Sequence, residues 1–180
     1  MRSLTARAVL LAALLPAACA TNPRVQTDRS PDADFSTYRT YAWREEPATQ
    51  SPLVRQRIVA AVDRALAAKG WHPVREPDAD ILVVAHVTSR EEETLETIYE
   101  SQQWRGWQWN DVPGTADART VSRIDRYTIG TLIVDLFDAR THRAVWRAVA
   151  EGTVPPSAAK INATIDETMP RMFDGLPKPP

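Results

Sequence analysis

Residues 127–152 constrain the fold more than any other segment, because they have the pattern of two β-strands joined by a short polar turn. On each side of the turn, β-branched, aromatic and small apolar residues recur at period two, which is typical of a strand. Paired residues in an antiparallel ladder point to the same face. If Leu136 lies opposite Trp146, then Asp135 lies opposite Arg147 on the other face. A slip of one residue would scramble both faces, so the pattern predicts this register.

Both faces of this predicted hairpin carry apolar residues, which indicates a sheet that is at least partly covered on each side. The register brings together two further apolar pairs, Val134 with Ala148 and Leu132 with Ala150. Asp135 is out of place in such a strand. We interpret Asp135 and Arg147 as a structural cross-strand pair, and a buried catalytic carboxylate at Asp135 is the alternative.

The N-terminus has the layout of a secretory signal peptide. Arg2 and Arg7 precede an apolar run at 8–15, and small residues follow it. This run is too short to cross a bilayer, which needs roughly 20 apolar residues. We therefore predict a signal peptide at residues 1–18, in preference to a short anchor helix that stays attached.

Cys19 is the only cysteine in the chain, and it follows Leu15-Pro16-Ala17-Ala18. This segment resembles the lipobox of bacterial lipoproteins, in which a lipid is attached to the cysteine thiol and the chain is cut just before it. Pro16 stands where that motif usually has leucine. A thiolate is the nucleophile that such a reaction needs, and lasting attachment needs more than one acyl chain, such as palmitate. The alternative is an unmodified cysteine beside an ordinary cleavage site.

Lipidation of Cys19 would place the protein close to a membrane. Residues 19–24 form the predicted lipidated tether, and five extended residues reach only about 17 Å. In proteobacterial lipoproteins an aspartate after the cysteine favours the inner membrane, so Ala20 favours the periplasmic face of the outer membrane. Loss of Arg2 and Arg7 makes a chain of net charge −1 slightly more acidic. The predicted anchor is therefore the lipid and not a basic patch.

Composition excludes several classes of function. A net charge of −1 provides no broad basic field for nucleic acid. One cysteine allows no internal disulfide and no multi-cysteine metal site. The three histidines are far apart in the sequence, and no nucleophile motif or phosphate-binding glycine loop is present. We predict no catalytic residues, no metal ligands and no cofactor, and we expect that the protein is not an enzyme.

Two helices are predicted. Residues 50–70 carry an apolar stripe at helical spacing, with Ser51 as N-cap and Pro52 in the first helical position. Residues 157–172 carry a second stripe, which Pro170 should kink or end.

The remaining strands are shorter or less certain in type. Strands are predicted at 25–28, 38–43, 81–87 and 119–127, whereas 94–101 fits either a strand or a short helix. We expect His86 to be a hydrogen-bonded core residue. Together these elements predict a single α+β domain at residues 25–180, a two-layer sandwich of a mainly antiparallel five- or six-stranded sheet and two helices.

A segment rich in tryptophan interrupts this pattern. Trp104, Trp107 and Trp109 lie among Arg, Gln and Asn side chains, a composition that suits stacking on a sugar of peptidoglycan or another glycan. The alternative, which we prefer, is a loop whose tryptophans close over the core or lie at the membrane interface.

Short motifs along most of the mature chain carry a family resemblance. They are 25–28 (VQTD), 34–43 (DFSTYRTYAW), 67–71 (AAKGW), 79–83 (ADILV), 130–138 (GTLIVDLFD) and 145–147 (VWR). In this order they resemble a family of bacterial lipoproteins described as domain of unknown function 4136. The resemblance implies a lipid-anchored envelope domain and transfers no catalytic residue.

We therefore predict a lipid-anchored cell-envelope protein that acts through protein contacts in envelope assembly or integrity. Its partners would be the membrane, through the lipid on Cys19, and another envelope protein, with no nucleic acid. The alternative is a glycan-binding or peptidoglycan-binding module that uses Trp104, Trp107 and Trp109. A hydrolase centred on Asp135 is the third hypothesis.

Overall fold

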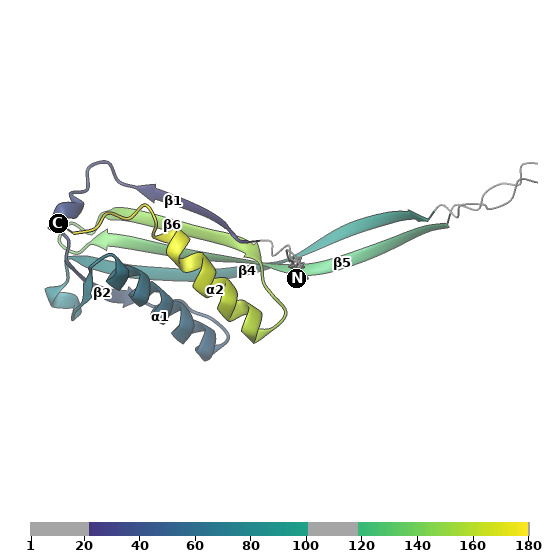
Figure 1. Ribbon diagram of the computed structural model, residues 1–180, viewed down its shortest axis with the longest axis horizontal. Coiled ribbons are helices and arrows are strands. Elements are labelled where there is room, and N and C mark those ends of the chain that lie inside the picture. Colours follow the sequence, from purple (N-terminus) through teal and green to yellow (C-terminus); the bar gives the residue numbers. More distant parts are fainter. Residues whose placement is uncertain (1–21, 101–118, 180) are drawn as a thin grey trace, which may run out of the picture.

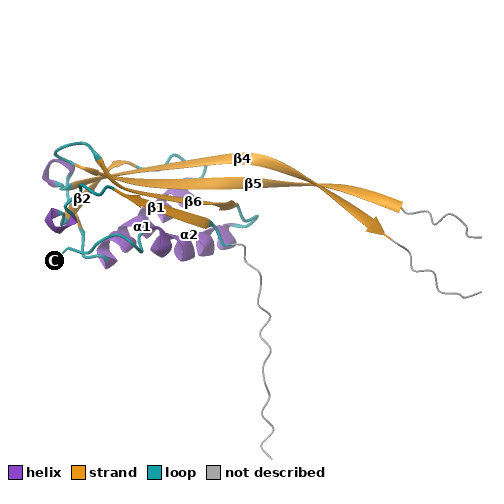
Figure 2. Ribbon diagram, turned by 90° about the horizontal axis from the view of Figure 1, so that it is seen from above, coloured by secondary structure: helices purple, strands orange, loops and turns teal. Residues whose placement is uncertain are grey.

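The computed structural model describes residues 22–100 and 119–179, and for residues 95–100 and 119–123 the backbone alone. An open six-stranded sheet has the strand order β1-β6-β5-β4-β2-β3, and two helices lie on one of its faces (Figures 1 and 2). The strands are β1 Arg24–Arg29, β2 Thr40–Glu45, β3 His72–Pro73, β4 Ile81–Glu100, β5 Arg119–Asp138 and β6 Ala144–Thr153. The helices are α1 Pro52–Ala68 and α2 Ala158–Met172. The predicted α+β architecture is confirmed.

The sheet is mixed, although most of its pairs are antiparallel. β2 pairs in parallel with both β3 and β4, whereas β1, β4, β5 and β6 form antiparallel ladders. The register predicted for the β5–β6 hairpin is confirmed, since Leu136 pairs with Trp146 and Asp135 pairs with Arg147. The register shifts just beyond, where Phe137 pairs with Ala144.

Serine side chains cap both helices. Ser51 accepts a hydrogen bond from the Val54 amide at the start of α1, and Ser157 accepts one from the Lys160 amide at the start of α2. These bonds satisfy amides that have no partner within the helix. Pro170 lies in the last turn of α2, and the helix ends two residues later. The predicted ends of both helices therefore agree with the structure to within a few residues.

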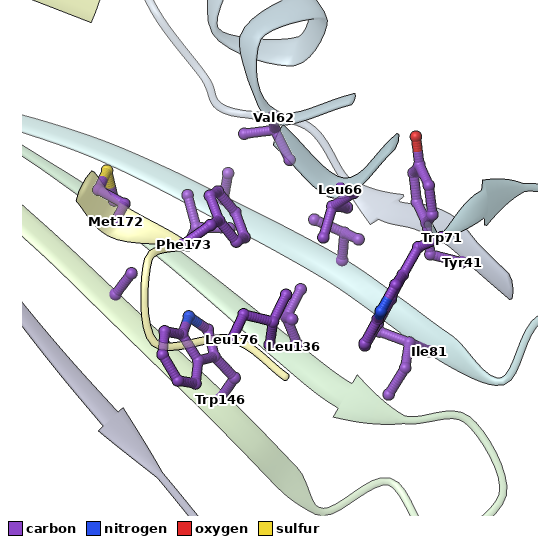
Figure 3. Packing of buried hydrophobic residues seen from close by; sticks show 14 of the residues in the cluster. Tyr41, Val62, Leu66, Trp71, Ile81, Leu136, Trp146, Met172, Phe173 and Leu176 are labelled. Atoms are coloured by element: carbon purple, nitrogen blue, oxygen red, sulfur yellow. The ribbon is translucent and has the colours of Figure 1, made fainter. Parts of the chain in front are cut away.

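The core lies between the helices and the sheet (Figure 3). Val62 and Leu66 of α1 are fully buried, and so is Trp71, which follows the helix. Gly70 between them has φ +91°, a backbone conformation that glycine adopts without the strain of a side chain. This left-handed residue turns the chain so that Trp71 packs back onto the core. Phe173, just after α2, belongs to the same buried cluster.

No helix covers the other face of the sheet in the described part of the chain (Figure 2). Asp135 and Leu82 are nevertheless buried there. Arg147 lies against Asp135, and the segments around Pro77 and Ala139 lie beside Leu82. The partial cover predicted for this face therefore comes from nearby side chains and loops, and not from a second layer of helices.

The prediction for His86 is wrong. Ile81, Val83 and Ala85 face the helices, so alternation along the strand directs His86 to the helix-free face. Its side chain is about half exposed, and Nδ1 lies 3.7 Å from the carboxylate of Glu45.

β4 and β5 are much longer than their neighbours. Residues 94–100 continue β4 as a strand, which decides between the two alternatives left open by the sequence. The pairing of β5 with β6 begins at Ile129, so the residues of β5 before Ile129 have no partner in β6. On the other edge, β4 pairs with β2 only as far as Val84. Residues 91–100 of β4 and 119–128 of β5 therefore project from the sheet as a two-stranded ribbon, called the arm below (Figures 1 and 2).

Candidate functional site

Cys19 and the tryptophans Trp104, Trp107 and Trp109 lie outside the described residues, so their predicted roles stay predictions. Asp135 and Arg147 lie together as predicted. Arg147 Nε donates to Asp135 Oδ1 at 2.6 Å, and Nη2 donates to Oδ2 at 2.8 Å. Such two-point pairs are strong because both bonds are charge-assisted.

The Asp135–Arg147 pair has the properties of a structural contact. Asp135 is only 3% exposed, whereas the Arg147 side chain is 59% exposed on the helix-free face. The hydrogen bonds and charge of Asp135 raise the pKa of Arg147, and the charge of Asp28 on β1 adds to this effect. Both carboxylate oxygens of Asp135 accept bonds from the guanidinium, which keeps this carboxylate engaged with its own neighbour.

The motif Pro-Asp-Ala-Asp occurs twice, at 31–34 and 77–80, and its last carboxylate accepts hydrogen bonds in each case. Asp34 accepts a hydrogen bond from the Ser36 amide, and Asp80 accepts bonds from the amides of Arg39 and Thr40. Burial alone would raise the pKa of Asp80, but these hydrogen bonds hold it below its usual value. Both repeats therefore provide turn and cap chemistry. Among the residues that the structure describes, no three His, Cys, Asp or Glu side chains come together as a metal site.

An apolar cavity opens between the sheet, the N-terminal half of α1 and the length of α2 from Ile161 to Met169. Its volume is about 500 Å³, within the range of roughly 300–1,000 Å³ found for small-molecule sites. Val54 and Ile58 of α1 and Ile161 and Ile165 of α2 contribute aliphatic side chains to its lining. No charged residue lines this cavity among the described residues. Its chemistry therefore suits an apolar ligand.

The cavity exists because side chains on the helix-facing side of the sheet become smaller toward the arm. Along β6 the helix-facing residues are Trp146, Ala148, Ala150 and Gly152, and Gly152 pairs with Gly130 of β5. Trp146 fills the space at the core end, whereas the small side chain of Ala150 leaves space above the sheet nearer the arm. The cavity therefore lies at the base of the arm.

The two glycines also allow neighbouring segments to close the rim of the cavity. A Cβ atom on Gly130 would lie 2.8 Å from the Cγ2 atom of Val154, which is closer than real Cβ contacts. A Cβ atom on Gly152 would lie 3.1 Å from the Cα atom of Pro23. Pro23 and Val154 can approach the sheet because neither glycine has a side chain.

Thr168 is the one polar group buried in this wall whose hydrogen-bonding capacity is unused. Its residue is 5% exposed, and Oγ1 has no hydrogen-bond partner in the described structure. Thr164, one turn earlier, instead donates to the carbonyl oxygen of Lys160. Thr168 therefore places one unpaired hydroxyl in a wall of the cavity.

The arm has polar side chains where its surface is described. Arg126 on β5 donates to Glu93 on β4 at 2.6 Å, and the Tyr127 hydroxyl donates to Glu92 at 3.1 Å. Ile124 is 58% exposed, and among the large apolar residues of the described chain only Leu53 is more exposed. No described strand pairs with the outer edges of β4 and β5 within the arm. Apart from the base of the arm, where the Val154 amide donates to the Thr128 carbonyl oxygen, the described strands leave both outer edges of the arm without a partner strand.

The family model for a domain of unknown function, DUF4136, matches residues 25–178. The chain belongs to the DUF4136 family. A crystal structure of a DUF4136 family protein from Bacteroides thetaiotaomicron has a TM-score of 0.50 at 15% identity, covering 85% of this chain and 95% of that chain. No curated protein is similar enough in sequence to count as a match.

Two further solved structures share the fold of this DUF4136 domain. The PelC dodecamer from Paraburkholderia phytofirmans has a TM-score of 0.52 at 13% identity, covering 88% of this chain and 99% of that chain. A PDZ domain protein from Parabacteroides distasonis has a TM-score of 0.50 at 13% identity, covering 84% of this chain and 35% of that chain. At these identities the likeness concerns the fold alone.

None of the helices described for this DUF4136 chain is both long enough and apolar enough to cross a membrane. Sequence analysis missed the cavity and the arm. The decrease in side-chain size toward Gly130 and Gly152 was a visible signal for the cavity. For the arm, the signal was the alternation of Thr, Ile and charged residues on both sides of the tryptophan-rich segment.

Proposed function

We propose that this DUF4136 protein is a non-enzymatic cell-envelope protein, held by lipid on Cys19 at the periplasmic face of the outer membrane, and that it acts through protein contacts made by the arm. The observation that carries the proposal is the pairing of the arm. Residues 91–100 and 119–128 pair with each other, and no described strand extends the sheet on either side.

A two-stranded ribbon of this kind gains stability from a third strand or a packed surface. Isolated hairpins are marginally stable in water, and open strand edges are templates for strand addition by another chain. The side chains of Glu91, Glu93 and Arg126 are exposed and carry both signs of charge. These charges oppose indiscriminate association, so they favour a partner with a complementary pattern.

A second copy of this chain is the first partner to test. PelC, which shares the fold, is a dodecamer. In a self-assembly, the arm of one copy would add to the sheet edge or arm of the next. A different envelope protein would use the same open edges, and its identity would emerge from the same experiment.

Photo-crosslinking in living cells tests the proposal. A photoreactive amino acid replaces Ile124 on the arm, and a matched control places it at Leu53, which is 65% exposed on α1. We expect discrete protein adducts from position 124 that mass spectrometry identifies, and few from position 53. Equal and diffuse labelling at both positions would contradict a contact role for the arm.

Fatty-acid labelling tests the anchor separately. Cells given a radioactive fatty acid should label the wild-type protein and not the Cys19→Ser variant. If both stay unlabelled, the proposed attachment to the membrane is wrong, whatever the arm contacts.

A glycan-binding module is the second candidate function. The segment 101–118, which contains Trp104, Trp107 and Trp109, joins the ends of the two strands of the arm. Retention of the full-length protein on purified peptidoglycan, lost on Trp107→Ala and kept on Trp43→Phe, would support this role. No retention of the wild-type protein would discard it.

A further inference from the structure

The apolar cavity lies where the chain approaches its proposed anchor. Pro23 forms part of its rim, four residues after Cys19. Four extended residues span at most about 14 Å. Any group carried by the Cys19 sulfur is therefore held within reach of the cavity mouth.

We infer that the cavity is a binding site for one acyl chain of the lipid on Cys19 of the same polypeptide. The inference rests on the proposed lipidation and deepens it. An acyl chain is long, flexible and uncharged, and it requires an apolar channel with an open end. The cavity offers such a channel, since it is open to solvent and its walls are formed by aliphatic side chains such as Ile161 and Ile165.

The tether favours this occupant over a free lipid. A ligand linked by a few residues is present at a millimolar effective concentration, so occupancy needs only a modest intrinsic affinity. Two acyl chains suffice for lasting attachment to a bilayer. A cysteine that carries a further chain can place it in the cavity while the others hold the membrane.

The positions of the polar groups in the cavity are compatible with an acyl chain that enters at the mouth and extends along the cavity. Thr49, Ser51 and Ser89 lie among its lining residues, and Ser89 is exposed. The apolar walls extend past them to Met169 and the floor residue Ala150, both buried. The hydroxyl of Thr168 meets no partner there, and a hydrocarbon would leave it without one. Thr168→Val, which keeps the shape and removes the hydroxyl, should therefore bind the chain at least as well.

The test uses full-length protein in cells fed a palmitic acid analogue with a diazirine on its chain. After irradiation, mass spectrometry maps which residues have been linked to the lipid on Cys19. We expect adducts at Leu132, Ile161 and Ile165, within polypeptides that still run as monomers on a denaturing gel.

Variants that narrow the cavity provide the control. Ala150→Leu at the floor should reduce these adducts by at least about fivefold, whereas Ala67→Leu on the exposed side of α1 should leave them unchanged. Ser89→Leu repeats the test at an exposed position, in case the buried substitution disturbs folding. Thr168→Val should keep or increase the adducts.

The outcomes separate the two proposals. An absence of label on Cys19 overturns the anchor and this inference together. Label on Cys19 without cavity adducts overturns this inference alone and leaves the anchor intact. Cavity adducts that persist in Cys19→Ser, formed by the free analogue, identify a membrane lipid as the occupant and overturn the assignment to the protein's own chain. Adducts that join two polypeptides overturn it in favour of a second copy.

Discussion

The carboxylate of Asp135 is buried inside a β-strand, and the guanidinium of Arg147 balances its charge. Arg147→Met keeps the apolar stem of the side chain and removes both hydrogen bonds of 2.6 and 2.8 Å. We expect a loss of about 1–3 kcal/mol in the free energy of unfolding, because a buried charge without its partner is costly. Urea denaturation at neutral pH measures this loss.

The double variant Asp135→Val with Arg147→Met should recover most of that loss, since it removes the charge that needs a partner. As a control, Arg64→Met removes an exposed ion pair with Asp166 and should cost less than about 1 kcal/mol. A double variant as unstable as Arg147→Met alone would show that the arginine acts by some other contact.

Asp138 makes the stability depend on pH. Burial alone would raise its pKa, but hydrogen bonds from the amides of Thr141 and Arg140 and from the hydroxyls of Tyr38 and Thr141 hold it below its usual value of 3.8. The unfolded chain then binds more protons than the folded protein, so stability is full above the ordinary carboxyl pKa and falls as the pH drops below it. Asp138→Asn should lower stability near neutral pH and weaken its loss in acid, as measured by urea denaturation across that range. Glu167→Gln on the exposed surface of α2 should leave the profile unchanged.

The arm and the sheet differ in what their sequences reveal. In the sheet, one face packs against helices, so apolar residues recur at period two and predicted the register of Leu136 with Trp146. In the arm, the described side chains of Glu91, Glu93 and Arg126 are exposed. A strand whose side chains lie in water needs no apolar pattern, so the charged residues at 89–93 carry no signal for a strand. For that reason the sequence around them does not indicate how far β4 extends.

His86 and the cavity show a second limit of local patterns. The apolar run at 81–87 indicates a strand, but only the pairing with neighbours decides which of its two faces meets the helices. His86 lies on the face that does not. A small residue such as Ala150 is equally typical of a place where two elements pack closely and of a place where a cavity remains. Which of these applies depends on where α1 and α2 lie, and that is a property of the tertiary structure.

The two strands of the arm pair mainly with each other, so the arm can be deleted without removing residues of the core. Arg90 pairs with Ile129 at its base, so an Asn-Gly turn that replaces residues 91–128 would close the hairpin there. We expect the free energy of unfolding to change by less than about 1–2 kcal/mol, because the core cluster contains no arm residue. The trimmed protein should no longer co-purify from cells with the partner that position 124 of the full-length protein crosslinks. Denaturant unfolding and co-purification measure the two effects independently, and a trimmed protein that unfolds would contradict this division.

At the scale of the whole molecule, several elements meet at one end of the sheet. The cavity is lined by Pro23 just before β1, by Ser51 and Pro155 before the two helices, and by Gly130 at the base of the arm. The fully buried side chains of Leu66 and Trp71 lie at the other end of α1, at its last turn and just after it (Figure 3). A lipid anchor at Cys19 would bring the hollow end toward the membrane. The arm would then start from that same end.

If an acyl chain occupies the cavity only in the folded protein, lipidation must stabilise the fold by mass action. At an effective concentration of about 10–100 times the dissociation constant, the gain is about 1–3 kcal/mol. For a domain of this length, each kcal/mol shifts the midpoint of thermal unfolding by about 2–4 °C. We expect lipidated wild-type protein in nanodiscs to unfold several degrees above Cys19→Ser protein mixed with the same nanodiscs, measured by tryptophan fluorescence. Ala150→Leu should abolish the difference between the lipidated and unlipidated forms, whereas Ala67→Leu should preserve it. Equal midpoints for wild type and Cys19→Ser would mean that the acyl chain stays in the bilayer and the cavity serves something else.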